Sequence, residues 1–346
     1  RAVQRIFQAK GRPSSHPVIV HLAPEAAWDP WCASLSTSGM RLADACWPGP
    51  LTIVAQRAPS VPEEVTGGQP TVAIRIPSHP VAIELLRAFG GGIAAPSANR
   101  FGHVSPTRAS HVATEFGELD LVILDGGASM VGLESTIVDC TVDPPRLLRP
   151  GSITRAMLEE VLGGRGLASA ATEGVPRVPG ALERHYAPRA QTLLVASDEL
   201  HRSAWGSGPA SLLACASVPA SVRRRFESVR ELPSDPAAYA HELYDALRAL
   251  DAAGPARIVI ERPPSGPAWE AVHDRLRRAA EPVEQGEGSS YGAHPDGVRQ
   301  GGVRQGGVRQ GGACQDGVRE GRACVDTSGH GNEPGSEVAP ATRDGV

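Results

Sequence analysis

The sequence predicts an α/β protein with two domains, and three observations support that prediction. Short apolar runs alternate with helical patterns up to residue 163, which is typical of a twisted mixed sheet with helices. A stretch rich in Gly, Ala and Ser then interrupts the pattern. Strands and helices resume beyond residue 190 at the spacing of a small open parallel sheet. We therefore expect a first domain over residues 1–163, a linker over residues 164–190 and a second, Rossmann-like domain over residues 191–285.

The first domain is expected to begin with the end of a helix, which leads through a turn near Gly11 into the first strand. Strands are predicted where apolar residues run together, and Pro96 ends one of them because proline has no backbone N–H to donate to a sheet. The predicted strands cover residues 18–22, 51–55, 71–76, 92–95, 121–124 and 136–142, and the predicted helices cover residues 31–46, 81–89, 107–115 and 154–162.

The second domain is expected to hold a smaller parallel sheet. Strands are predicted over residues 191–196, 210–216 and 257–261, with helices over residues 237–250 and 268–280. No G-x-G-x-x-G or P-loop pattern occurs in this domain, so we assign it no ligand of its own.

A repetitive segment follows the second domain. Residues 286–346 are Gly-rich, with a GVRQG unit that recurs from residue 297 onward. Because such a segment buries too little apolar surface to offset its ordering entropy, we expect a low-complexity disordered tail.

The composition limits the class of protein. A net charge of −4 provides no basic field, so we expect no stable nucleic-acid binding. The six cysteines form no C-x-x-C pair and no metal-ligand spacing, which predicts reduced thiols, a cytoplasmic location and no metal site. No apolar run of about 18 residues occurs, so we expect no membrane association. The chain begins with Arg rather than Met, from which we expect that an N-terminal segment is missing.

The run AAPSANRFGHVSPT, residues 94–107, indicates a nucleotide site. Ser97 and Asn99 come directly after a predicted strand, where hydroxyl, amide and free backbone N–H groups can bind phosphate. Gly102 allows close backbone approach, and Ser105 precedes a predicted helix. An ordinary turn is the alternative, since Ser, Asn, Gly and Pro are common turn residues.

The only lysine of the chain points to the same chemistry. The other 33 basic residues are arginines, so Lys10 is retained where a compact point charge is needed. Arg12 adds a planar fork suited to phosphate oxygens. The alternative is a pair of cations placed favourably at a helix C-terminus.

Further motifs occur in order along residues 1–280. The chain contains AKGRP from residue 9, HPVIVH from 16, WPGPLT from 47, TVAIR from 71, PSAN from 96, ESTIVD from 134, LRPG from 148 and HYAP from 185. Together they resemble the YrdC-like family of threonylcarbamoyl-AMP synthases, in the longer form with a C-terminal domain.

The resemblance implies an activity. Such proteins join L-threonine, bicarbonate and ATP into threonylcarbamoyl-adenylate and release pyrophosphate, and a partner complex then transfers the threonylcarbamoyl group to an adenosine of certain tRNAs. No side-chain nucleophile is required, so catalysis rests on positioning and on neutralising phosphate charge, with Mg²⁺ bound through the phosphates.

The resemblance also implies the site residues. Lys10 and Arg12 would be catalytic. ATP would be bound by Arg12, His16, Thr71, Ser97, Asn99, Ser105, Arg149, His185 and Tyr186. Threonine would be bound by His21, Arg75, Ala95 and Ser135, with Arg75 suited to pair with its carboxylate as a bidentate fork.

The sequence departs from the family pattern at three points. The position of His16 often holds Asn, and residues 181–184 lack the usual aromatic and basic pattern of the interdomain segment. The family's usual first strand, with a turn whose Thr helps to hold threonine, is not found, so we expect impaired activity.

Other readings stay open. Without the family, His21 would be an ordinary strand histidine and Arg75 a cross-strand arginine. A double-stranded RNA or ribosome-binding module of the same fold is the alternative function. A carbamoyltransferase of the hydrogenase-maturation type is disfavoured, because zinc-finger cysteines are lacking.

Overall fold

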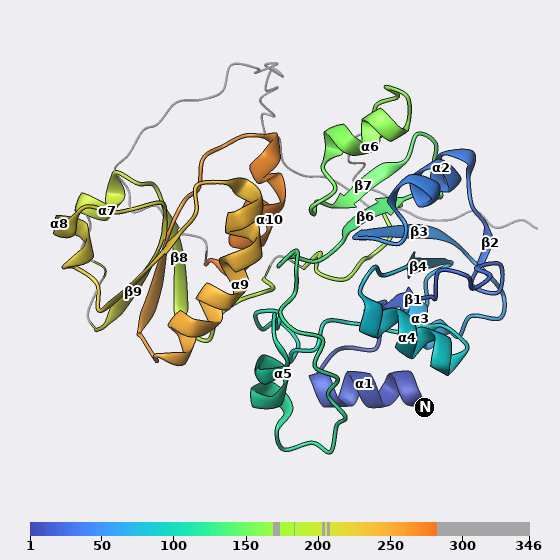
Figure 1. The fold of residues 1–346 in the computed structure, drawn as a ribbon, viewed down its shortest axis with the longest axis horizontal. Helices are drawn as coiled ribbons and strands as arrows, with labels where there is room; N and C mark the ends of the chain where they lie inside the picture. Colours follow the sequence, from blue (N-terminus) through green and yellow to red (C-terminus); the bar gives the residue numbers. More distant parts are fainter. Residues whose placement is uncertain (169–173, 183, 203–204, 206–207, 282–346) are drawn as a thin grey trace, which may run out of the picture. The chain divides into compact units, whose positions relative to one another are not determined.

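Two β-sheets, each with its own helices, organise the chain (Figure 1). The computed structural model describes residues 1–168, 174–182, 184–202, 205 and 208–281, all within one compact unit. The predicted α/β class, with one mixed and one parallel sheet, is confirmed. The tail predicted over residues 286–346 lies outside the described residues.

The first sheet is built from β1 (Ile19–His21), β2 (Cys32–Ser34), β3 (Leu51–Arg57), β4 (Thr71–Arg75), β5 (Ile93–Ala94), β6 (Thr136–Asp139) and β7 (Arg146–Arg149). Its order is β5–β1–β4–β3–β6–β7, with β2 paired to β3. The pairs β1–β4 and β3–β6 are parallel, and the other pairs are antiparallel. The ends of β1 and β4 therefore meet at one edge, where His21 and Arg75 are register partners.

The helices of this domain are α1 (Ala2–Lys10), α2 (Thr37–Cys46), α3 (Glu63–Thr66), α4 (Pro80–Phe89), α5 (Ala109–Phe116) and α6 (Arg155–Val161). One face of the sheet is covered by several of them. Leu51 of β3 packs with Leu42 of α2 and Leu158 of α6. Val72 of β4 packs with Phe7 of α1 on the same face.

The opposite face of the sheet is covered differently. Side chains alternate along a strand, so Ile19, Val54, Ala73 and Ile137 point to this second face. They pack there against Val178, which belongs to the linker and not to a helix. The candidate site described below lies on this face.

The second sheet is built from β8 (Gln191–Val195), β9 (Ala210–Cys215), β10 (Ser228–Leu232) and β11 (Arg257–Glu261). Its order is β10–β9–β11–β8, and all three pairings are parallel. Its helices are α7 (Glu199–Arg202), α8 (Ala220–Arg223), α9 (Pro236–Ala252), the short 3₁₀ helix η1 (Pro267–Trp269) and α10 (Glu270–Ala279).

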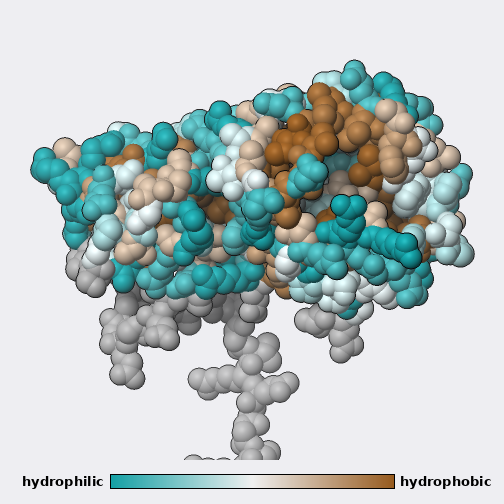
Figure 2. All heavy atoms as spheres, turned by 90° about the horizontal axis from the view of Figure 1, so that it is seen from below, coloured by the Kyte–Doolittle hydropathy of each residue, from teal (hydrophilic) through white to brown (hydrophobic). Residues whose placement is uncertain are grey.

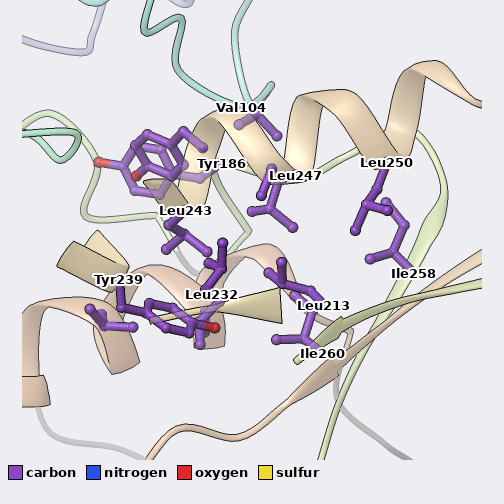
Figure 3. Packing of buried hydrophobic residues seen from close by; sticks show 14 of the residues in the cluster. Val104, Tyr186, Leu213, Leu232, Tyr239, Leu243, Leu247, Leu250, Ile258 and Ile260 are labelled. Atoms are coloured by element: carbon purple, nitrogen blue, oxygen red, sulfur yellow. The ribbon is translucent and has the colours of Figure 1, made fainter. Parts of the chain in front are cut away.

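The core of the second domain extends beyond its own residues. Leu213 of β9 and Ile260 of β11 pack beneath Leu243 of α9 (Figure 3). Val104 and the linker residue Tyr186 belong to the same buried cluster and are labelled next to α9 in Figure 3. The two domains are thus joined by shared apolar packing as well as by the polar contacts described below.

Several predicted elements need correction. Residues 121–124 form no strand, and Val122 is 91% exposed, because the described residues offer this apolar run no pairing partner. The helix predicted over residues 31–46 is a short strand, β2, followed by α2, which begins where the Ser36 Oγ accepts a hydrogen bond from Gly39 N at 3.0 Å. Strands β7 and β10 were not predicted.

Apolar residues gather on one face of the molecule around a hollow (Figure 2). The large exposed apolar side chains of the first domain include Leu85, Phe89, Leu121, Val122, Ile123, Leu124 and Met130. Among the described helices, none is long and apolar enough to cross a membrane.

Candidate functional site

A cavity of about 230 Å³ lies on the second face of the first sheet. Its walls come from the ends of β1 and β4, the loop after β5, the residues around the start of β6 and the end of β7, and two pieces of the linker. The lining residues are Arg12, Ile19, His21, Arg75, Ala95, Pro96, Ser97, Glu134, Ser135, Arg149, Pro179, Gly180, His185 and Tyr186.

A larger hollow of about 470 Å³ lies between α5 and α9. Its charged walls are paired with one another, as Arg248 with Glu115 and Arg189 with Asp251, both at 3.1 Å. The smaller cavity instead combines several guanidinium groups with a single carboxylate, so we take it as the candidate site.

His21 and Arg75 stand side by side on the parallel strands β1 and β4. Arg75 Nε donates to Gly49 O at 3.0 Å, which fixes the side chain and leaves its terminal nitrogens for a ligand. Burial, with the nearby Arg75, lowers the pKa of His21 to about 3, so this imidazole is neutral. Burial also lowers the pKa of Arg75 to about 10, and the guanidinium remains charged at neutral pH.

Arg149 ties Ser135 to the linker. Its Nε and NH2 groups donate to Ser135 O at 3.1 and 2.9 Å, and its NH1 group donates to Pro179 O at 2.8 Å. The Ser135 Oγ lies 2.7 Å from Thr52 Oγ1. A buried guanidinium therefore holds the start of β6 and the linker together at the cavity wall.

Lys10 and Arg12 are positioned by the end of α1. Gly11 caps the helix with a left-handed φ of 64°, which turns the chain between the two cations. Lys10 is therefore the last residue of the helix, and Arg12 is the first residue after the turn. Lys10 Nζ donates to Ser97 O at 2.5 Å and to Asn99 O. Burial, and then Arg12, lowers the pKa of Lys10 to about 7.

Arg12 Nε and Asn99 Oδ1 are buried and have no hydrogen-bond partner among the described residues. The same holds for His185 Nδ1 and Tyr186 OH in the cavity lining. Arg12 donates from NH2 to Pro17 O at 2.7 Å, and Asn99 donates from Nδ2 to the carbonyls of Arg100 and His103. Since unpaired buried polar groups are costly, these atoms are candidates for contact with a ligand or water.

The linker closes one side of the cavity with His185 and Tyr186. Tyr186 has a positive φ of 61° and stacks on Tyr244 of α9 with ring centroids 5.6 Å apart. Its hydroxyl lies so close to Gly180 that a Cβ there would meet it at 1.9 Å. Burial lowers the pKa of His185 to about 4, so its ring is neutral.

Sequence reasoning missed Glu134, the carboxylate of the cavity. Ser105 Oγ donates to Glu134 Oε1 at 2.6 Å, while Arg275 Nε and Tyr244 OH donate to Oε2 at 2.9 and 3.0 Å. Burial raises the pKa of Glu134, but the charges of Arg275 and Arg149 and the hydrogen bonds from Ser105 and Arg275 outweigh burial and lower the pKa to about 2. Its place before Ser135 in ESTIVD was the available signal.

The structure brings together most of the predicted site residues. Arg12, Ser97, Arg149, His185 and Tyr186, predicted for ATP, share the cavity with all four predicted threonine residues, His21, Arg75, Ala95 and Ser135. The described lining does not include Lys10, His16, Thr71, Asn99 or Ser105. Lys10 and Ser105 touch it indirectly, through Ser97 and Glu134.

His16 and Thr71 do not line the cavity. His16 is nevertheless connected to it, since Phe101, on which it packs, also contacts the lining residues Arg12 and His185. The ring of His16 meets that of Phe101 edge to face at 5.3 Å, and Thr71 begins β4, four residues before Arg75. Within the described residues, no group of three or more His, Cys, Asp or Glu side chains could hold a metal ion.

The chain matches two family models over most of its described length. Residues 1–151 match the Sua5/YciO/YrdC model, described as "Telomere recombination", and residues 153–281 match the model "Threonylcarbamoyl-AMP synthase, C-terminal domain".

Individual relatives agree with the family models. The threonylcarbamoyl-AMP synthase of Pyrococcus abyssi is 42% identical over 56% of this chain and 58% of its own length, and that of Bacillus subtilis is 42% identical over 55% and 56%. The chain thus spans little more than half of these relatives. The crystal structure of P. abyssi Sua5 complexed with L-threonine superposes with a TM-score of 0.72 at 34% identity, covering 81% of this chain and 84% of that one.

Proposed function

Because the chain belongs to the YrdC-like threonylcarbamoyl-AMP synthase family, we propose that it is an L-threonylcarbamoyladenylate synthase. It would form threonylcarbamoyl-AMP and pyrophosphate from L-threonine, bicarbonate and ATP. The product would serve threonylcarbamoyladenosine modification of tRNA in the cytoplasm, through a separate transferase complex.

The observation that carries this proposal is the composition of the cavity. Three guanidinium groups, those of Arg12, Arg75 and Arg149, line a space that also contains a neutral imidazole and a serine hydroxyl. Such a set suits an amino acid carboxylate next to a polyphosphate. A volume of about 230 Å³ accommodates an amino acid and an adjoining phosphate.

The reaction proceeds in two steps. The uncharged amine of threonine combines with bicarbonate to give a carbamate and water. A carbamate oxygen then attacks the α-phosphorus of ATP, the bond to the β-phosphate oxygen breaks, and pyrophosphate leaves. Neither step needs a protein nucleophile, so the protein acts by orienting the reactants and by neutralising charge.

The amino acid half of the site would be formed by β1, β4 and β6. Arg75 would bind the threonine carboxylate through its terminal nitrogens. His21, which is neutral, and Ser135 would contact the threonine hydroxyl or amine by hydrogen bonds. A cationic imidazole would repel the ammonium of incoming threonine, and burial keeps this one neutral.

The nucleotide half would be formed by α1, the Ser97 loop and the linker. Arg12 and Arg149 would neutralise the phosphates, and the unpaired Arg12 Nε provides a free donor for this purpose. Lys10 would contribute its charge while holding the Ser97–Asn99 loop. Mg²⁺ would be held by the phosphates of ATP, and its chemistry is to offset their charge.

The test is pyrophosphate release that depends on both threonine and bicarbonate. We expect Arg75→Ala and Ser135→Ala to raise the KM for threonine by about ten-fold or more, with a smaller effect on the KM for ATP. Arg87→Ala is the matched control, since among the described residues Arg87 pairs with the exposed Glu25 at 2.6 Å and does not line the cavity. Pyrophosphate release without a threonine requirement, or RNA binding in place of turnover, would exclude this function.

A further inference from the structure

The second domain contacts the candidate site by binding a single carboxylate of the first domain, that of Glu134. Glu134 belongs to the cavity wall, whereas Arg275 belongs to α10 and is 141 residues further along the chain. Arg275 Nε donates to Glu134 Oε2 at 2.9 Å, and the guanidinium is completely buried. Tyr244 of α9 donates to the same oxygen at 3.0 Å. Two helices of the second domain therefore fix one wall residue of the first.

The charge of Glu134 opposes the function proposed for the cavity. It is the only carboxylate among the described lining residues, and it stands beside groups that would bind phosphate. An unpaired carboxylate at this position would repel a polyphosphate strongly, because charges interact at low effective dielectric in a buried site. The ion pair with Arg275 cancels that charge without adding a cation to the cavity lining.

The same helix also fixes the linker. Asp274 accepts from Arg275 NH1 at 2.6 Å and from Arg278 NH2 at 2.9 Å. Arg278 in turn donates from NH1 to Leu182 O at 2.5 Å, and its carbonyl accepts from His185 N at 3.0 Å.

The linker tyrosine is held by a further contact with α10. The Arg275 guanidinium carbon lies 5.3 Å from the ring centroid of Tyr186. The segment that closes the cavity is thus bound to α10 by one main-chain hydrogen bond, one hydrogen bond from the Arg278 side chain and this cation–π contact.

We propose that Arg275 is a positioning residue of the nucleotide site, which neutralises and orients Glu134 and seats the linker tyrosine. The inference rests on the proposed function and deepens it. It gives the second domain a role in the chemistry of the first. The second domain supplies the positive charge that neutralises Glu134, so that the cavity can bind a polyphosphate without repulsion.

Charge rescue tests this role. Arg275→Met removes the counter-charge at similar length, and we expect it to raise the Kd and the KM for ATP by about ten-fold or more. Adding Glu134→Gln to that variant removes the uncompensated carboxylate, and we expect ATP affinity to return to within about three-fold of the wild type. A merely structural arginine would give no such rescue.

The matched control is Arg108→Met. Arg108 also forms an ion pair between the two domains, with Asp245 at 2.8 Å, but it is half-exposed and lies outside the cavity lining. We expect unchanged ATP affinity from it. Calorimetry and turnover are measured on the full chain, and circular dichroism checks the fold of each variant.

The outcomes separate the two proposals. ATP affinity that is unchanged by Arg275→Met, or equally poor in the single and double variants, overturns the inference and leaves the proposed function intact. If Arg275→Met does not fold, Arg275→Lys is compared with the double variant Arg275→Lys/Tyr244→Phe. The proposal requires the single variant, which keeps the charge, to have an ATP affinity closer to that of the wild type than the double variant has. A wild-type chain that neither binds ATP nor releases pyrophosphate overturns the proposed function and the inference with it.

Discussion

Binding of ATP is predicted to draw a proton onto Lys10. Its side chain is only 6% exposed, and burial together with Arg12 lowers its pKa to about 7. At about pH 8, roughly one free enzyme molecule in ten therefore carries the ammonium form. Phosphates next to this site favour the charged form, and a bound-state pKa above about 9 would make the lysine almost fully protonated. The expected uptake is about 0.8 to 0.9 proton per ATP bound.

Isothermal titration calorimetry measures this uptake. The observed binding enthalpy is plotted against the ionisation enthalpy of several buffers, and the slope gives the number of protons exchanged. The histidines nearby do not interfere, since burial lowers the pKa values of His16 and His185, the latter to about 4. Lys10→Arg is the control, because its guanidinium is already charged and its slope should be near zero. Equal slopes in wild type and control would refute the assignment.

Three further predictions follow from packing and charge. Gly180→Ala should displace the linker, because its Cβ would meet Tyr186 OH at 1.9 Å, and turnover should fall about ten-fold. The control is Gly164→Ala, which should keep its activity because Gly164 also has a positive φ but has open space around it. Leu158→Ala, at a fully buried position, should lower the free energy of unfolding in urea by about 2–5 kcal/mol. Glu134 has a lowered pKa of about 2, so its ionised form stabilises the fold fully above its unfolded pKa near 4.5. This stabilisation is lost as the pH falls from 4.5 toward 2. In urea titrations at pH values in this range, Glu134→Gln should make the free energy of unfolding less dependent on pH.

The apolar runs of the sequence located the central strands and the edge strands β5 and β8, but not the edge strands β7 and β10. β3 and β6 are buried on both faces and read as continuous apolar segments. β7 has the sequence RLLR and β10 the sequence SVREL, whose charged residues give no such run, and both are strands because a neighbour pairs with them. The run LVIL at residues 121–124 has strong strand propensity and no partner among the described residues, so it stays irregular.

The residues of the candidate site also differ in how far the sequence could predict them. Residues that follow strands, such as Ser97, could be predicted because strand ends converge at one edge. Glu134 was missed since its significance lies in contacts with Arg275 and Tyr244, which local sequence cannot reveal. Lys10 was singled out from the sequence, and its partners in the structure are the carbonyl groups of the neighbouring loop. Its predicted contact with phosphate stays a prediction.

The partners of Lys10 suggest why a lysine serves at this position. Arg12 and Arg75 have pKa values of about 10, lowered by burial, so the cavity keeps both charges at neutral pH. Lys10 titrates near 7 and donates to two carbonyls, those of Ser97 and Asn99. A neutral amine has two N–H groups and an ammonium has three, so either form can hold both carbonyls. The lysine can therefore change its charge when phosphate arrives without releasing the loop that forms the cavity wall.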